Sequence, residues 1–257
     1  MTVSRRVPAL LLSVFLSALL PTPSARAADQ PSALDAESRF NMALQHLREG
    51  RTEMAVAEIK LAIKEDGKNA YFHKGLGMAH LQRREFDKAV EALRKALELN
   101  PYYTDVRNDL GTALILSGRR EEGKKEFLTA FNDPTYNAPE VAARNLGQAH
   151  FEEKQYEQAL NWYRTSTQRN PKYADAWLGL ADVYVVLGRA DEAVAQMQAA
   201  QRELPDSVSV QLGYGEVCYR AGRLSEARDS LEGVARKDPA GSAGRRALEL
   251  LRRFPQK

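Results

Sequence analysis

The chain has 257 residues, of which 44% are hydrophobic and 28% are charged, and its formal net charge is +3. Three arginines and no acidic residue lie in the first 27 residues, and without that segment the basic and acidic residues are equal at 34 each. Because nucleic-acid binding needs a basic surface, this balance argues against a nucleic-acid partner and against a role on membrane surfaces.

Residues 1–27 have the pattern of a secretory signal peptide. An arginine pair precedes an apolar run at 7–20, and a small-x-small sequence follows at 25–27. The apolar run is 14 residues long, too short to span a bilayer comfortably, although an uncleaved anchor is an alternative. We predict cleavage before Ala28 and a short linker at 28–35.

The chain contains a single cysteine, Cys218, so an intramolecular disulfide is excluded. No cysteine lies near the predicted cleavage site, so the lipid-attachment residue of a bacterial lipoprotein is missing. We therefore predict a periplasmic protein that associates with the outer membrane only through a partner.

Small residues recur at a near-constant spacing along the rest of the chain. Successive members of the first series are 34, 34, 36, 34 and 34 residues apart, and a second series runs in phase twelve residues later. A period of 34 with small residues at these places is typical of the tetratricopeptide repeat, a hairpin whose helices A and B cross closely. The first series is Ala43, Gly77, Gly111, Gly147, Ala181 and Gly215, and the second is Ala55, Ala89, Gly123, Ala159, Ala193 and Ala227.

The sequence predicts an all-α superhelical solenoid of six tetratricopeptide repeats with a C-terminal capping helix. Four of the six units have a proline near their end, where it stops helix B. In four of the six units, not the same four, a glycine lies in the turn between the two helices. The predicted units are 36–69, 70–103, 104–137, 140–173, 174–207 and 208–241, followed by a capping helix and tail at 242–257.

The interval of 36 residues falls between the third and fourth units. Two prolines, two asparagines and an aspartate lie within ten residues there, which indicates an ordered turn rather than a continued helix. One explanation is a length variation in a surface loop, since loops tolerate insertions readily.

The loop also carries a family resemblance. The sequence Asp133-Pro134-Thr135-Tyr136, followed by Pro139 and by Asn145-Leu146-Gly147, resembles the type IV pilus biogenesis/stability proteins (PilW/PilF/Tgl-like). That family is similar in having a signal peptide, six repeats and this loop at the same place, and the resemblance covers roughly residues 36–254. It implies a protein that helps the outer-membrane secretin assemble. This chain lacks the lipid-bearing cysteine of the family.

Catalytic and metal-binding chemistry finds little support in the sequence. Three of the four histidines occupy the same position of helix A in different units, so they belong to the packing pattern rather than to one converging site. No glycine-rich phosphate loop, nucleophile elbow or paired-cysteine motif is present. We predict no enzyme activity, cofactor, metal or small-molecule substrate. The three histidines are His46, His80 and His150.

A protein partner is the better-supported ligand. In this repeat type, five positions of helix A line an inner groove, and many of them are apolar here although they face an open surface. Such a groove suits an amphipathic helix or an extended apolar segment with a few polar anchors. Alternatively, neighbouring repeats half-bury several of these residues. The predicted groove residues are Tyr71, Lys74, Met78, Leu81, Asn108, Thr112, Ile115, Leu116, Arg144, Gln148, Phe151, Leu178, Asp182, Val185 and Val186.

We predict from these patterns a non-enzymatic periplasmic scaffold that assists type IV pilus biogenesis by binding the secretin in this groove. Two other hypotheses stay open. One is a generic periplasmic scaffold for a cell-wall, polysaccharide-export or outer-membrane complex, which neighbouring genes would identify. The other is a regulatory subunit of a hydrolase or transferase, which would co-purify with a catalytic chain.

Overall fold

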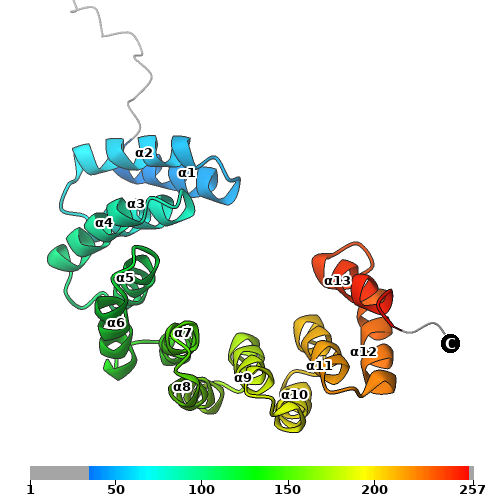
Figure 1. The fold of residues 1–257 in the computed structure, drawn as a ribbon. Helices are drawn as coiled ribbons and strands as arrows, with labels where there is room; N and C mark the ends of the chain where they lie inside the picture. Colours follow the sequence, from blue (N-terminus) through cyan, green and yellow to red (C-terminus); the bar gives the residue numbers. More distant parts are fainter. Residues whose placement is uncertain (1–34, 255–257) are drawn as a thin grey trace, which may run out of the picture. The chain divides into compact units, whose positions relative to one another are not determined.

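The structure, a computed structural model, describes residues 35–254, so the predicted signal peptide at 1–27 and nearly all of the linker at 28–35 lie outside the described residues. Within them, thirteen α-helices follow one another without a strand (Figure 1). The helices are α1 (Ala36–Arg48), α2 (Thr52–Glu65), α3 (Ala70–Gln82), α4 (Phe86–Leu99), α5 (Thr104–Leu116), α6 (Arg120–Asn132), α7 (Pro139–Glu152), α8 (Tyr156–Arg169), α9 (Ala174–Val186), α10 (Ala190–Glu203), α11 (Val208–Arg220), α12 (Leu224–Lys237) and α13 (Ser242–Leu251).

The helices pair as hairpins, with odd-numbered helices as helix A and even-numbered helices as helix B. Within a hairpin the two helices cross where a small residue of helix A meets a large side chain of helix B. A Cβ atom added at Gly77 would lie 2.5 Å from Leu93, and one added at Gly147 would lie 2.9 Å from Tyr163. These distances leave no room for a side chain at Gly77 or Gly147. Together with the order of the helices, the crossings confirm the predicted all-α solenoid of hairpins.

The turns between helices A and B place one residue in the left-handed backbone region. Glycine takes this conformation in four hairpins, where it carries no steric cost. In the second and fourth hairpins the same conformation falls on Arg84, at φ 59°, and Lys154, at φ 62°. A side chain there crowds the neighbouring carbonyl, so these two turns are strained. The four glycines are Gly50, Gly118, Gly188 and Gly222.

Replacing Lys154 with glycine is expected to raise the free energy of unfolding by about 0.5–1 kcal/mol, because relief of left-handed strain exceeds the entropic cost of glycine. Urea titration followed by circular dichroism measures the change. Gly118→Ala is the reverse control and is expected to lower stability. Destabilisation by Lys154→Gly would mean that the lysine side chain itself supports the turn.

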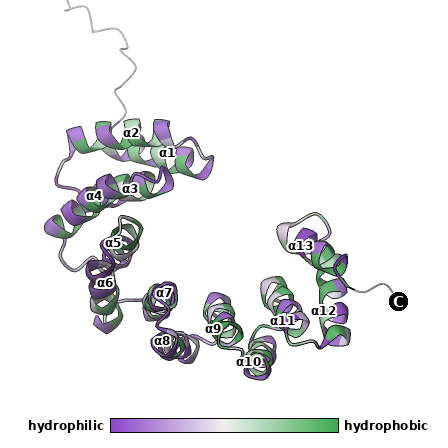
Figure 2. Ribbon diagram, viewed as in Figure 1, coloured by the Kyte–Doolittle hydropathy of each residue, from purple (hydrophilic) through white to green (hydrophobic). Residues whose placement is uncertain are grey.

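Buried apolar side chains form separate clusters along the array. One extends from Phe40 to Ala79, a second from Ala89 to Leu114, and the largest from Ala159 to Phe254. Each helix carries both hydrophilic and hydrophobic residues (Figure 2), as expected for helices that bury one face. The junction between α6 and α7 carries a small cluster of its own, formed by Ala130, Tyr136 and Ala142.

The histidines at the shared position of helix A contact their own hairpins. His80 Nδ1 lies 2.6 Å from Glu85 Oε2, and His150 Nδ1 lies 2.6 Å from Gln155 Oε1. His46 makes the corresponding contact with the residue five positions later, at 3.0 Å. Burial lowers the pKa of His80, and the nearby Glu85 opposes this only in part. The contacts tie the end of each A helix to its turn.

Helix α13 covers the end of the last hairpin. Ala247 and Leu250 are buried in the C-terminal cluster, whereas Leu248 is 43% exposed. The Arg246 guanidinium is 2.8 Å from the carboxylate of Glu216 on α11. Apolar packing and this ion pair together fix the helix against the array.

Candidate partner-binding face

The A helices of successive hairpins contact one another directly, from α1 with α3 through to α11 with α13. In the described part of the chain the backbone of each B helix comes close only to the helices immediately before and after it, and successive B helices meet through side chains such as Arg94 of α4 and Glu122 of α6, 2.7 Å apart. The A helices therefore share one surface, which we name the A-helix face (Figure 1).

All of the residues predicted to line the groove lie on α3, α5, α7 and α9. Leu116 and Val186 are each 50% exposed, and Tyr71 and Met78 are 47% and 44% exposed. Asp182 is exposed as well. These five residues offer apolar and acidic contacts to a partner on the A-helix face.

The other ten predicted groove residues are half-buried. Leu81 packs against the cluster of α4 and α5, while Phe151, Leu178 and Val185 pack against the C-terminal cluster. The Phe151 ring lies 5.8 Å from the Tyr156 ring, between centroids. Neighbouring helices thus cover part of these side chains, and the open apolar surface is smaller than the groove pattern predicted.

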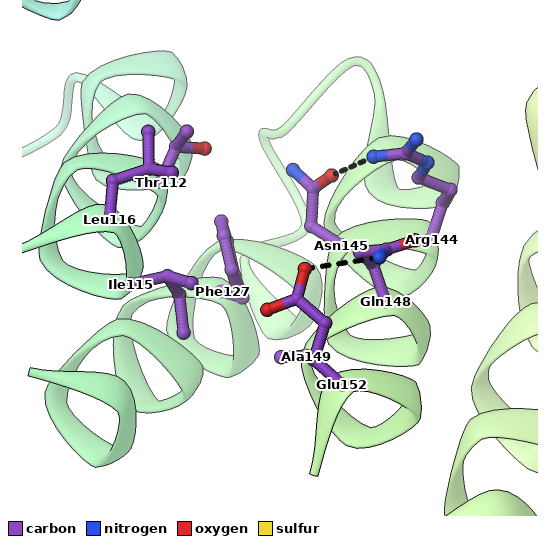
Figure 3. Close-up of a pocket in the computed structure, with 9 residues that line it drawn as sticks. All are labelled: Thr112, Ile115, Leu116, Phe127, Arg144, Asn145, Gln148, Ala149 and Glu152. Carbon is purple, nitrogen blue, oxygen red and sulfur yellow. Dashed lines mark hydrogen bonds between the residues drawn. The ribbon is translucent and has the colours of Figure 1, made fainter. Parts of the chain in front are cut away.

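A pocket of about 200 Å³ opens between α5 and α7, with one wall residue from α6 (Figure 3). It brings together five of the predicted groove residues and adds four that the sequence pattern did not select. Leu116 and Ile115 form the apolar side, facing polar side chains of α7 (Figure 3). The predicted members are Thr112, Ile115, Leu116, Arg144 and Gln148, and the additional ones are Phe127, Asn145, Ala149 and Glu152.

Glu152 and Gln148 on the polar side of the pocket are already engaged. Gln148 Nε2 donates to Glu152 Oε1 at 3.1 Å and its Oε1 accepts from the Tyr163 hydroxyl at 2.9 Å. Arg120 on α6 pairs with Glu152 at 2.9 Å. Burial acts to raise the pKa of Glu152, but hydrogen bonds from Gln148 and Arg120 outweigh it and leave that pKa lowered. Glu152 therefore stays ionised, and the positive charge of Arg120 compensates its negative charge.

Asparagines link the two A helices at the other end of the pocket. Asn145 Nδ2 donates to Asn108 Oδ1 at 3.0 Å, and Arg144 Nη1 donates to Asn145 Oδ1 at 3.1 Å. Arg144 Nε is buried and has no hydrogen-bond partner in the described residues. The sequence pattern selected Asn108 and Arg144 but missed Asn145, which lies one position outside the groove positions.

A second pocket, of about 280 Å³, lies on α9, α11 and α13. Leu178 is its single predicted member. The rest come from α11, the A helix of the sixth repeat, and from the start of α13, because the predicted groove residues were confined to the second to fifth repeats and the capping helix is not a repeat. The other lining residues are Ser209, Leu212, Gly213, Glu216, Ser242 and Ala243.

The loop between α6 and α7 is ordered by Asp133. Its Oδ1 accepts hydrogen bonds from the Thr135 amide at 2.8 Å and hydroxyl at 2.6 Å, and its Oδ2 accepts from the Thr104 hydroxyl at 2.8 Å. The bonds from Thr135, with help from Thr104, hold the pKa of Asp133 below its usual value. Since Thr104 begins α5, the carboxylate ties the loop to the preceding A helix.

Tyr136 turns inward from this loop and is 8% exposed. It packs with Ala130 of α6 and Ala142 of α7, while Pro134 and Thr135 stay exposed. Pro139 is the first residue of α7, where its missing amide hydrogen costs nothing. The composition of the loop predicted an ordered turn but gave no signal that one aromatic side chain fills the junction.

Asp109 on α5 is a charged residue that the groove pattern missed. It is half-buried and makes no hydrogen bond or ion pair with the described residues. Burial raises the pKa of Asp109 to about 6, opposed by Lys74 and assisted by Asp105. Lys74 is 3.8 Å from the Asp105 carboxylate, so the positive charge of Lys74 acts on both Asp105 and Asp109.

Comparisons with known proteins agree with the hairpin geometry. Profiles of the tetratricopeptide repeat match residues 70–103, 150–208 and 180–242. Type IV pilus assembly protein PilF of Pseudomonas aeruginosa is 28% identical over 147 residues, which cover 57% of this chain and 58% of PilF. The crystal structure of PilW, a widely conserved type IV pilus biogenesis factor, matches with a TM-score of 0.67 at 22% identity, over 83% of this chain and 98% of PilW.

The solved structure of Pseudomonas aeruginosa PilF matches with a TM-score of 0.63 at 21% identity, over 84% of this chain and 97% of that one. At this identity the two structures establish the shared fold, and the sequence match to PilF spans little more than half of either protein. The chain is a tetratricopeptide-repeat protein that is related in sequence to the type IV pilus assembly protein PilF and shares its fold with PilF and PilW.

Proposed function

We propose that this protein is a non-enzymatic scaffold of the periplasm that assists type IV pilus biogenesis by binding a secretin subunit on its A-helix face. The observation that carries the proposal is the pocket between α5 and α7, with half-exposed Leu116 on one wall and polar groups on the other. The relationship to PilF suggests the process in which the scaffold acts.

The proposed mechanism is temporary protection of an apolar segment. A subunit that has not yet assembled exposes apolar surface that its oligomer later buries, and such surface aggregates when it is left open. The A-helix face offers an apolar contact at Leu116 and polar anchors on α7. Holding the segment there until the oligomer forms requires binding alone and no chemical step.

Periplasmic location is part of the proposal. The arginine pair, the 14-residue apolar run and the small-x-small sequence of the first 27 residues support export and cleavage. Among the described helices, none has the length and apolar character needed to cross a membrane. Contact with the outer membrane then depends on the bound partner.

Leu116→Glu is expected to reduce capture of the secretin subunit by about tenfold or more, because it places a charge in the apolar wall that a partner must desolvate. Leu128→Glu is the matched control, since Leu128 is 42% exposed on the B helix of the same hairpin and Leu116 is 50% exposed. Secretin recovered from an envelope extract by each purified variant measures the effect. Both variants should keep the helical content of the wild type.

Deletion of the gene tests the process itself. We expect fewer surface pili and fewer secretin multimers, restored by the wild type and by Leu128→Glu but not by Leu116→Glu. Unchanged pili and multimers after deletion would refute the pilus role. Capture of a different envelope protein that still depends on Leu116 would instead support the generic scaffold.

A further inference from the structure

Arg144 is a groove cation with no acidic partner in the described residues. We propose that it binds a side-chain carboxylate in an internal segment of the partner, while an aliphatic side chain next to that carboxylate occupies the pocket between α5 and α7. This inference rests on the proposed function, because it names the chemistry of the segment that the A-helix face takes.

Two neighbouring cations are paired with acidic residues. Arg120 pairs with Glu152 at 2.9 Å, and Lys124 pairs with Glu153 at 2.8 Å. In contrast, Arg144 forms no ion pair with the described residues, and its one hydrogen bond runs from Nη1 to the neutral Asn145 amide. The unpaired charge of the pocket is therefore positive.

The Nε–H group of Arg144 adds a hydrogen-bond donor that needs an acceptor. This nitrogen is buried and lacks an acceptor, and a buried donor without a partner is costly. Nε and Nη2 form one edge of a guanidinium, and such an edge holds a carboxylate through two parallel hydrogen bonds. Among the described residues the guanidinium donates one hydrogen bond, to Asn145, and the proposal requires the side chain to turn so that this edge meets the ligand carboxylate.

Arg83 supplies the contrast within the chain. Its Nε also lacks an acceptor, but its terminal nitrogens pair with Glu85 at 3.1 Å and Glu53 at 3.9 Å. An unsatisfied Nε alone therefore marks no binding site. Arg144 combines that orphan donor with an unneutralised charge at the wall of a pocket.

The pocket determines the second feature of the ligand, the aliphatic side chain. Ile115, Leu116 and Phe127 provide its apolar surface (Figure 3). Its volume of about 200 Å³ is below the roughly 300–1,000 Å³ of small-molecule sites, so it suits one anchoring side chain. Glu152 at the far end is neutralised by Arg120 and does not repel an acidic ligand.

A side-chain carboxylate fits better than a chain terminus. The polar groups that could join Arg144 around a terminal carboxylate are already engaged. Lys74 is engaged with Asp105, and Asn108 and Asn145 are hydrogen-bonded to each other. One free guanidinium matches one side-chain carboxylate.

The test is an NMR titration of the purified protein with three peptides, followed through the arginine Nε–H signals and the methyl signals. They are acetyl-Ala-Leu-Asp-Ala-amide, its Asn counterpart, and acetyl-Ala-Ala-Leu with a free C-terminus. The Asp peptide is expected to shift the Arg144 Nε–H signal and the Ile115 and Leu116 methyl signals. It should bind at least about tenfold more tightly than the Asn peptide, because charge-assisted pairs are the stronger ones.

Variants then assign the preference to the guanidinium. Arg144→Gln is expected to abolish the Asp-over-Asn preference, Arg144→Lys to restore only part of it, and Arg83→Gln to leave it unchanged. Equal binding of the Asp and Asn peptides, an intact preference in Arg144→Gln, or no saturable shift at all would overturn the inference. Binding of the free C-terminus alone would also overturn it. The proposed function is judged separately by secretin capture, so Leu116-dependent capture with no peptide preference would spare it.

Discussion

Replacing Tyr136 with alanine is expected to lower the free energy of unfolding by about 3 kcal/mol, the usual cost of removing a buried aromatic ring. Tyr136 is 8% exposed and packs between Ala130 of α6 and Ala142 of α7. The two buried neighbours are alanines, too small to fill the space that the ring would leave, while the partly buried Phe131 and Ala138 pack against the same cluster. Urea titration of the variant against the wild type measures the loss.

Tyr136→Phe is the control for the ring alone. The Tyr136 hydroxyl has no hydrogen-bond partner in the part of the chain that the structure describes, so its removal is expected to change stability by less than about 1 kcal/mol. If Tyr136→Ala also costs less than about 1 kcal/mol, the loop is a passive length variation and the ring does not support the junction.

Asp109→Asn is expected to stabilise the protein by about 2 kcal/mol at neutral pH. Burial raises the pKa of Asp109 from 3.8 to about 6, so the folded protein binds a proton more tightly than the unfolded chain does. Stability therefore falls as the pH rises from about 4 to about 6, and the full cost of the buried charge is present above that window. Asparagine keeps the shape without the charge.

The gain should disappear below pH 4, where aspartate is protonated in both states. Urea titrations of wild type and variant at pH 3.5 and pH 7 give the comparison. A gain that is the same at both pH values would show that the new amide, and not the loss of the charge, stabilises the fold, and no gain at either would show that the Asp109 carboxylate is paired or hydrated. Lys74 is the one cation that opposes the shift, so Lys74→Met should raise the pKa further.

The sequence allowed the helices to be predicted because their signal is periodic. Gly77 and Gly147 recur where Leu93 and Tyr163 cross them, and any larger residue would collide there. Such constraints repeat in every hairpin and can be recognised without coordinates. The turn residues Arg84 and Lys154 were not predictable in this way, because their left-handed conformation follows from the hairpin geometry and not from their own preferences.

The candidate site was only partly predictable. Leu116 and Val186 occupy the last of the five groove positions of helix A and lie on the surface, whereas Phe151 and Leu178 occupy two other groove positions and are half-buried. The groove pattern treats the five positions alike, but packing against neighbouring helices covers some of them more than others. Asn145 was missed for the same reason, since its role depends on a partner on another helix.

The small cluster around Tyr136 has a consequence for how the protein unfolds. Each repeat contacts only its neighbours, so cooperativity has to pass through every junction in turn. On one side of this junction the nearest large cluster ends at Leu114 and on the other it begins at Ala159, with buried side chains such as Phe127 and Leu146 between them. We therefore expect the first three hairpins and the last three to melt as two coupled equilibria, for which a single midpoint temperature is not a well-defined quantity.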